Sequence, residues 1–280
     1  MPVVYACAAS HAPGITAWRD AASPTQLTHV TEAFARLQHG LRAARPDRLL
    51  LLTSEHWANF FLDHIGAFCI GRADYYEGPV EPWLKIEKKR IPGDPALALR
   101  LLEHCYAHGF EIDHAHEMRL DHGTMVPLSF LSPGADIPIV PILFNTLAPP
   151  RARPERCIAL GKVLRSILDA APERIAVIAT GGMSHDPGEI NHGYIDSDFD
   201  RRFLDDMAGG NLSVLGQYTD SQLMAAGAGT AELLAWLCLA GIMEGRHPQI
   251  ALYEPVVPWA TGIGMLAYDM AAGLTADVAA

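Results

Sequence analysis

The sequence has few of the features that proteins use to bind nucleic acids or to cross membranes. Basic residues are in the minority, with 21 Lys and Arg against 32 Asp and Glu, so the formal net charge is −11. Their longest block is Lys88-Lys89-Arg90, which is too short to follow a phosphate backbone. No uncharged run approaches the roughly 20 residues that a membrane-spanning helix needs, and no basic segment precedes the first apolar stretch. We therefore expect a cytoplasmic protein that binds neither nucleic acid nor membrane.

Cysteine is scarce as well. The chain has five, an odd number, and they are widely scattered and mostly set within apolar runs. They are Cys7, Cys69, Cys105, Cys157 and Cys238. Such a set argues against a disulfide framework, and we predict reduced cysteines in the core. Half of the residues are hydrophobic, enough for a sizeable core, and no repeat or linker divides the chain, so we expect one domain spanning residues 1–280.

Strands and helices alternate along the chain. Four short runs rich in Val, Ile or Leu predict buried strands, because they are too short to be core helices. They cover residues 3–8, 48–53, 137–144 and 174–180. Helical patterns cover residues 26–44, 95–108, 154–171 and 230–243. The alternation predicts an α/β fold with a central sheet flanked by helices.

Two further segments are rich in proline. Residues 74–95 combine several prolines with a charge cluster, which predicts an excursion over the surface rather than a linker between domains. Residues 253–264, YEPVVPWATGIG, follow the last predicted helix. They should return over the edge of the sheet, either as a loop or as a closing strand.

Three histidines occupy the same local position, shortly after a predicted strand. His11 follows the first strand in ACAASHAPG, His56 follows the second in LLTSEHW, and His185 follows the fourth in IATGGMSHDPG. A single histidine in a loop is more often a solvated or capping residue. Three side chains just past the carboxyl ends of strands, however, can converge where α/β sheets bind ligands. Imidazole is a common ligand of iron and zinc, so we predict a metal site there that includes His11 and His56.

A fourth histidine, His122, lies in RLDHGTMVPLSFL and leaves two interpretations open. Asp121 and His122 can simply form a turn and the first residues of a helix. Alternatively, His122 belongs to the same site as the histidines that follow the strands. The other nine histidines carry less signal, and those at positions 104, 108, 114 and 116 need no explanation beyond solvation.

Glu232 is a carboxylate in an apolar setting. It is the only charge in GTAELLAWLCLAGIM, and helical spacing places it on one face with Ala235 and Trp236, which predicts that it points inward. A buried carboxylate without a partner costs several kcal/mol, so Glu232 needs a cation or donors. In a first helical turn, backbone N–H groups would supply the donors. Alternatively, Glu232 joins His11 and His56 in the two-histidine, one-carboxylate ligand set of non-haem Fe(II) oxygenases.

These residues lie in motifs that resemble those of the class III extradiol dioxygenases, of the protocatechuate 4,5-dioxygenase beta-subunit type. The motifs are SHAPG (10–14), SEHW (54–57), LDHGTMVPL (120–128), GGMSHDPG (181–188) and GTAELLAW (229–236), in this order. The resemblance implies a single α/β domain with the metal site at the carboxyl ends of the strands. It further implies that His11, His56 and Glu232 bind Fe(II), that His185 is the catalytic acid/base, and that His122 is the second catalytic histidine.

The implied reaction is the cleavage of a catecholic ring by O2, beside rather than between the two hydroxyl-bearing carbons, to give a semialdehyde acid. The metal would bring catechol and O2 together, and a histidine would remove a catechol proton and assist ring opening. In several members a small helical second subunit covers the site. The expected partners are therefore the catechol, O2, and a small helical subunit or further copies of this chain.

Two rival functions fit the same residues. Two histidines and one glutamate with an open position also describe a catalytic zinc site, which predicts a hydrolase. A metal pocket on the same fold can also serve a binding protein without catalysis, although the two proton-transfer candidates argue against this. The sequence does not indicate the ring substituent. In the segment VPWATGIGM, only Thr261 and backbone groups are candidates to bind a substrate carboxylate.

Overall fold

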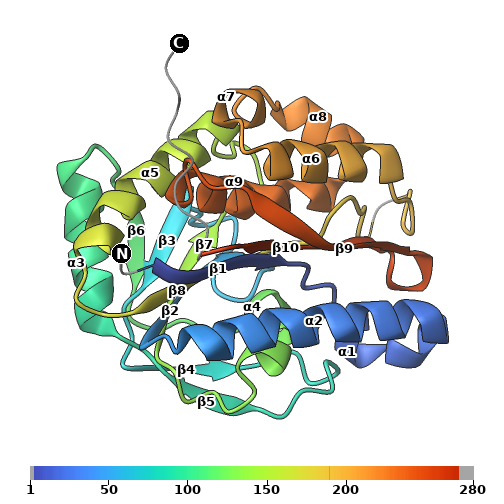
Figure 1. Ribbon diagram of the computed structural model, residues 1–280, viewed down its shortest axis with the longest axis horizontal. Helices are drawn as coiled ribbons and strands as arrows, with labels where there is room; N and C mark the ends of the chain where they lie inside the picture. Colours follow the sequence, from blue (N-terminus) through green and yellow to red (C-terminus); the bar gives the residue numbers. More distant parts are fainter. Residues whose placement is uncertain (1–2, 189, 271–280) are drawn as a thin grey trace.

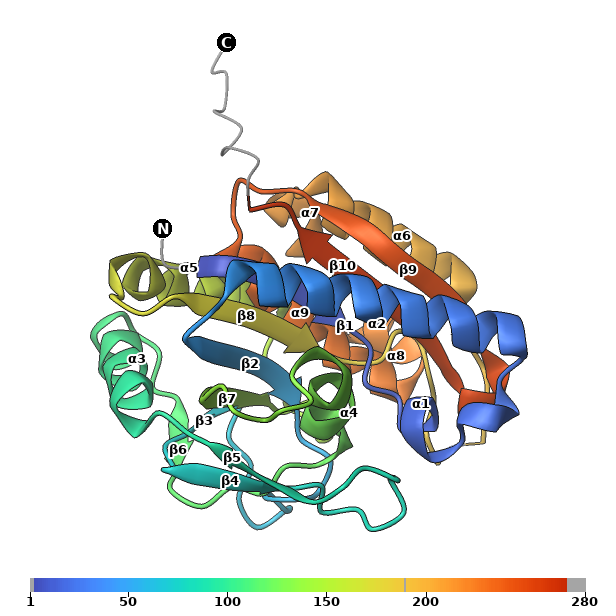
Figure 2. The same ribbon diagram turned by 60° about the horizontal axis from the view of Figure 1, so that its bottom comes forward.

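A mixed sheet of eight strands forms the centre of the molecule (Figures 1 and 2). The computed structural model describes residues 3–188 and 190–270. The strands of this sheet are β1 (Val3–Ala9), β2 (Arg48–Ser54), β3 (Phe68–Gly71), β6 (Asp113–Ala115), β7 (Ile139–Phe144), β8 (Ile175–Thr180), β9 (Pro248–Val256) and β10 (Thr261–Tyr268). Their order across the sheet is β6-β3-β7-β2-β8-β1-β10-β9. A separate antiparallel pair is formed by β4 (Tyr75–Gly78) and β5 (Lys89–Pro92).

The four strands that the apolar runs predict lie together at the centre of the sheet. β7, β2, β8 and β1 are neighbours in this order and run parallel. Almost every residue in them is buried. A strand that is covered on both faces has no solvent-facing side, which explains these nearly continuous apolar sequences. Because parallel strands end at the same edge, the segments that follow β2, β8 and β1 begin side by side.

Antiparallel strands complete the sheet. β10 pairs with β1, and β9 pairs with β10. Residues 253–264 therefore contribute to a closing strand pair rather than to a loop, with the short 3-10 turn η3 (Val257–Trp259) at the bend. On the other side β3 pairs antiparallel with β7, and β6 pairs parallel with β3. The sequence did not predict β3 and β6, which have four and three residues and too short an apolar pattern.

Helices cover both faces of the sheet (Figure 1). They are α1 (Gly14–Ala17), α2 (Pro24–Ala44), α3 (Pro95–Ala107), α4 (His122–Leu131), α5 (Pro154–Ala170), α6 (Ser197–Gly209), α7 (Leu212–Leu215), α8 (Asp220–Ala225) and α9 (Leu233–Ile242), with the 3-10 turns η1 (Arg19–Ala21) and η2 (Ala228–Glu232). α2 and α4 share one buried apolar cluster, and α3, α5, α6 and α9 share the other. Leu49 and Leu51 of β2 belong to the first cluster, whereas Leu50 and Leu52 belong to the second, as alternation along a strand requires.

Two expectations from the sequence need correction. The helix expected over residues 230–243 begins only at Leu233, because residues 228–232 form η2, where Gly229 packs against the ring of His185. Residues 74–95 are more than a surface excursion, since Tyr76, Leu84 and Ile91 are at most 1% exposed and join the core beside α4. The prediction for cysteine is confirmed, because all five are buried and unpaired. No helix in the described part of the chain is long and apolar enough to cross a membrane.

Candidate active site

The five residues singled out in the sequence meet at the carboxyl edge of the parallel strands. His11, His56 and His185 follow β1, β2 and β8, while His122 opens α4 and Glu232 ends η2. Nε2 of His11 lies 2.9 Å from Oε2 of Glu232, and Nε2 of His56 lies 3.0 Å from Oε1. The rings of His56 and His122 have their centroids 4.0 Å apart. Residues from five separate parts of the chain thus form one cluster.

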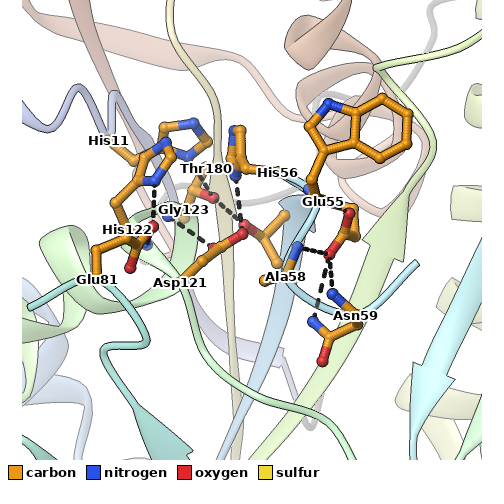
Figure 3. Close-up of polar contacts among 12 residues, drawn as sticks. His11, Glu55, His56, Ala58, Asn59, Glu81, Asp121, His122, Gly123 and Thr180 are labelled. Carbon is orange, nitrogen blue, oxygen red and sulfur yellow. Dashed lines mark hydrogen bonds and ion pairs between the residues drawn. The ribbon is translucent and has the colours of Figure 1, made fainter. Parts of the chain in front are cut away.

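Hydrogen-bond partners define which nitrogen of His11 and His56 carries a proton (Figure 3). Nδ1 of His56 lies 3.0 Å from Oδ2 of Asp121, a carboxylate that can only accept. Nδ1 of His11 lies 3.1 Å from the hydroxyl oxygen of Thr180, whose own hydrogen is donated to Thr53. Both Nδ1 atoms are therefore donors. In the neutral rings, each Nε2 atom then presents its lone pair to the carboxylate of Glu232, which lies between the two rings.

This arrangement fits a metal ion. Nε2 of His11 is buried, and among the described residues it has no hydrogen-bond partner, although the oxygen of Glu232 lies only 2.9 Å away. A nitrogen lone pair and a carboxylate oxygen at this distance repel one another unless a cation or a proton lies between them. Two imidazole nitrogens and a carboxylate are a common donor set for iron and zinc. The hydrogen bonds at the two Nδ1 atoms would hold the rings in the orientation that such an ion needs.

Burial and neighbouring charges shift the pKa values of these groups. Burial alone would raise the pKa of Glu232, but His11 and His185 hold it well below its usual range. Burial likewise opposes ionisation of Asp121, yet His56 lowers the pKa of that carboxyl to about 2. Burial lowers the pKa of His11, whereas at His56 the two carboxylates outweigh burial and raise the pKa well above its usual value. A metal ion that binds here would displace a proton from His56.

His185 lies beside this trio rather than within it. Its Nε2 is 3.7 Å from Oε1 of Glu232, and its Nδ1 is 2.8 Å from the carbonyl oxygen of Met183, to which it donates. Gly229 packs so closely that a Cβ atom there would lie 2.1 Å from Nε2 of His185. Burial lowers the pKa of His185, but the charge of Glu232 outweighs it and raises the pKa overall. The ring is thus fixed next to the possible metal position.

His122 lies at the start of a helix and also beside the other histidines. Asp121 is the N-cap of α4, so the segment does begin a helix. At the same time a ring nitrogen of His122 lies within 4.8 Å of nitrogens of His11 and His56, which makes it a further candidate ligand. Nδ1 of His122 lies 2.7 Å from Oε1 of Glu81, which comes from the segment between β4 and β5 (Figure 3).

Sequence reasoning missed two carboxylates that support the site, Glu81 and Glu55. Glu55 is 3% exposed and accepts the backbone N–H groups of Trp57, Ala58 and Asn59 at distances of 2.6–2.8 Å. These bonds hold the turn after β2, in which Trp57 has the left-handed φ of 58°, a strained value for a bulky residue. In the sequence, the one local indication of a role for Glu55 was its position directly before His56.

Similarity to curated proteins extends over the whole chain. A 2,3-dihydroxyphenylpropionate/2,3-dihydroxicinnamic acid 1,2-dioxygenase of Cupriavidus necator is 25% identical, over 97% of this chain and 100% of the relative. A protein of the same name from Paraburkholderia xenovorans is 26% identical, over 95% of this chain and 97% of the relative. The similarity therefore covers nearly the whole of both chains.

The fold is shared with a solved structure, and one protein family matches the sequence. The crystal structure of an uncharacterized protein from Escherichia coli K12 superposes with a TM-score of 0.58 at 15% identity, covering 95% of this chain and 99% of that chain. Residues 5–263 match the family described as the catalytic LigB subunit of aromatic ring-opening dioxygenase. The chain therefore belongs to this family, and it is an extradiol dioxygenase that opens catechol-type rings with O2.

Proposed function

We propose that residues 1–280 form one catalytic domain whose reaction depends on Fe(II) bound by His11, His56 and Glu232. The observation that carries this proposal is the approach of both Nε2 atoms to the Glu232 carboxylate, at 2.9 and 3.0 Å, without a hydrogen bond at His11. Two nitrogens and one carboxylate leave coordination positions open for a bidentate catechol and for O2. When bound, the ion supplies the means to bring both reactants together and to pass electron density between them.

We assign the third ligand to Glu232 rather than to His122. The Glu232 oxygens lie 2.9 Å from Nε2 of His11 and 3.0 Å from Nε2 of His56, whereas a ring nitrogen of His122 lies within 4.8 Å of nitrogens of these two rings. A carboxylate also balances part of the ion's charge in a buried site, which a third neutral imidazole would not do.

We assign proton transfer to His185 chiefly, with His122 as the second participant. Each ring donates its Nδ1 hydrogen to a fixed acceptor, so each keeps Nε2 for the substrate. One imidazole must take a proton from the catechol as it binds, and an imidazolium must return a proton as the ring opens. Such acid–base help typically accelerates a reaction by about 10²–10⁴-fold.

The first candidate substrates are catechols that carry a three-carbon acidic side chain, because the curated relatives are named for such compounds. Thr261 is a poor candidate to bind the acid group. Its hydroxyl donates to the carbonyl oxygen of Trp259, which leaves an acceptor rather than a donor. A small helical second subunit or a homo-oligomer stays a prediction, which light scattering on the purified chain would test.

One experiment tests the function directly. The protein is reconstituted with Fe(II) under anaerobic conditions and mixed with O2 and one of several catechols, among them 2,3-dihydroxyphenylpropionate, 2,3-dihydroxycinnamate, protocatechuate and gallate. We expect stoichiometric O2 uptake and a ring-opened product that carries both atoms of labelled O2. Hydrolase activity with Zn²⁺ and no iron-dependent O2 uptake would contradict the proposal, as would tight catechol binding without turnover.

A further inference from the structure

The segment between β4 and β5 carries a carboxylate to the proton-transfer side of the site. Oε1 of Glu81 accepts two hydrogen bonds from a single residue, His122: one from ring Nδ1 at 2.7 Å and one from the backbone N–H at 3.0 Å. Only 15% of the Glu81 side chain is exposed. Figure 3 shows the two side chains facing each other beside His11 and Asp121. Glu81 therefore contacts both the backbone and the ring of His122.

Stability alone does not explain this carboxylate. Its second oxygen, Oε2, is buried and has no hydrogen-bond partner within residues 3–188 and 190–270. A buried carboxylate oxygen without a donor is unfavourable. Two backbone hydrogen bonds already attach this segment to the residues that precede α4. The N–H of Val80 donates to the carbonyl oxygen of Leu120, and the N–H of Leu120 donates to the carbonyl oxygen of Glu77, both at 2.9 Å. The attachment of the segment therefore does not depend on Glu81.

The chemistry of the contact selects one state of His122. An ionised carboxylate can only accept hydrogen bonds, so Nδ1 of His122 must carry a hydrogen. In the neutral ring, the lone pair then resides on Nε2, the atom left free to accept a proton from a substrate. His185 has the same arrangement with a different partner, because its Nδ1 donates to the neutral carbonyl of Met183. His122 and His185 are thus held in the same tautomer, the first by a carboxylate and the second by a carbonyl oxygen.

We propose that Glu81 is a positioning residue, which fixes the orientation and the Nδ1–H tautomer of His122 so that Nε2 meets the bound catechol. This inference rests on the proposed function, in which His122 takes part in proton transfer. It makes the segment between β4 and β5 a functional part of the active site.

The kinetic test compares variants of Glu81 in the Fe(II)-loaded enzyme. Glu81→Met has a similar length and no oxygen to accept, so kcat should fall by about 10- to 100-fold, the usual effect of losing a partner that orients a site residue. KM and bound iron should stay within about twofold, since the metal-binding trio does not contact Glu81. Glu81→Gln keeps an acceptor oxygen and should recover most of kcat. Glu87→Ala removes an exposed carboxylate from the same segment and should leave kcat unchanged.

A second measurement does not depend on activity. Long-range ¹H–¹⁵N correlation spectra of ¹⁵N-histidine-labelled protein, loaded with diamagnetic Zn²⁺, report the tautomer of each ring. We expect the Nδ1–H form of His122 in the wild type and in Glu81→Gln, and a mixture or the Nε2–H form in Glu81→Met. An unchanged tautomer in Glu81→Met would overturn the proposal, and so would a loss of iron and a rise in KM at unchanged kcat. Absence of ring cleavage by the wild type would instead overturn the proposed function and leave this result standing.

Discussion

At the scale of single residues, Glu232 connects the possible metal ligands. Its two oxygens face His11 and His56, and Oε2 also accepts the N–H of Gly182 at 2.5 Å. We predict that Glu232→Ala loses iron and activity together, because a three-ligand site that loses one ligand keeps too little affinity. Glu232→Gln should be nearly as damaging, since an amide lacks the charge. Iron assays after anaerobic reconstitution, run beside oxygen uptake, measure both effects.

The matched control for this prediction is His122→Ala, which should keep its iron. Iron retained in Glu232→Ala and lost in His122→Ala would move the third ligand to His122. Glu254 is a poor substitute for Glu232, because it lies in β9 and pairs with His29 at 3.0 Å.

His185 offers the opposite prediction. His185→Ala should keep iron and still bind the catechol, but turn over about 10²–10⁴-fold more slowly, because we assign proton transfer rather than ligation to this ring. Single-turnover kinetics at matched iron content separate binding from chemistry. Loss of iron in a variant with an unchanged fold would show that His185 is itself a ligand.

A site residue could be predicted only where the sequence immediately around it is unusual. His11, His56 and His185 were recognisable because each follows an apolar strand, and Glu232 because it is a lone charge in an apolar run. Glu81 had no such signal, since its partner His122 lies 41 residues away and only the folded chain brings them together. A contact between a loop residue and the first residue of a distant helix leaves no periodic pattern in the sequence.

At the scale of elements, η2 sets the position of His185. We predict that Gly229→Ala lowers kcat strongly while iron is retained, because the added Cβ would lie 2.1 Å from Nε2 of His185 and force the ring away. Gly209→Ala, at the end of α6, is the control, since a Cβ there meets no atom within 4 Å. Equal kcat values for both variants would show that His185 tolerates displacement.

Helix α6 carries a second prediction, which concerns pH. Asp200 is fully buried and accepts hydrogen bonds from the backbone and hydroxyl of Ser184, both at 2.8 Å, and from the hydroxyl of Tyr253 at 2.9 Å. Burial nevertheless raises the pKa of Asp200 to about 6. The value in the unfolded chain is about 3.9, so folding favours the neutral form. Its contribution to the free energy of unfolding is complete below about pH 4 and is lost as the pH rises through 6.

The measurement compares wild type and Asp200→Asn by urea unfolding between pH 4.5 and 7. Between pH 4.5 and 7 the wild type should lose about 2 kcal/mol relative to the variant. A shift of about two pKa units corresponds to about 3 kcal/mol in all, and roughly a third of this is already lost at pH 4.5. The difference between the two curves removes the effect of all other titrating groups. Parallel curves would mean that Asp200 ionises as easily in the folded state as in the unfolded one.

The elements that the sequence predicted are the strands whose residues are almost all apolar and the helices with a long apolar periodicity. The four parallel strands and the helices α2, α3 and α5 fall within two residues of their expected bounds. The sequence did not reveal η2, because its contact between Gly229 and His185 joins residues that are far apart along the chain. The short strands β3 and β6 take their conformation from their neighbours in the sheet rather than from their own composition.

At the scale of the whole molecule, metal binding should be linked to global stability. The trio lies just after β1, just after β2 and at the end of η2, so an ion that binds only the folded chain would stabilise all three elements at once. At an ion concentration of 100 times Kd, the gain is about 2.7 kcal/mol. We predict a rise in Tm on the order of 5 °C with anaerobic Fe(II). Glu232→Ala, measured by the same calorimetry, should show no such rise.

The order of the strands also determines when the site can exist during synthesis. β1 is made first, yet both of its neighbours in the sheet, β8 and β10, are made after residue 174. A nascent chain on the ribosome thus exposes His11 and His56 long before Glu232 has been translated. Until then the polypeptide offers imidazoles without the carboxylate, and its first strand has no partner. With the proposed ligands, metal binding by all three residues has to wait until Glu232 has been made. A product that terminates before β8 would keep an unpaired apolar strand as a target for proteolysis or aggregation.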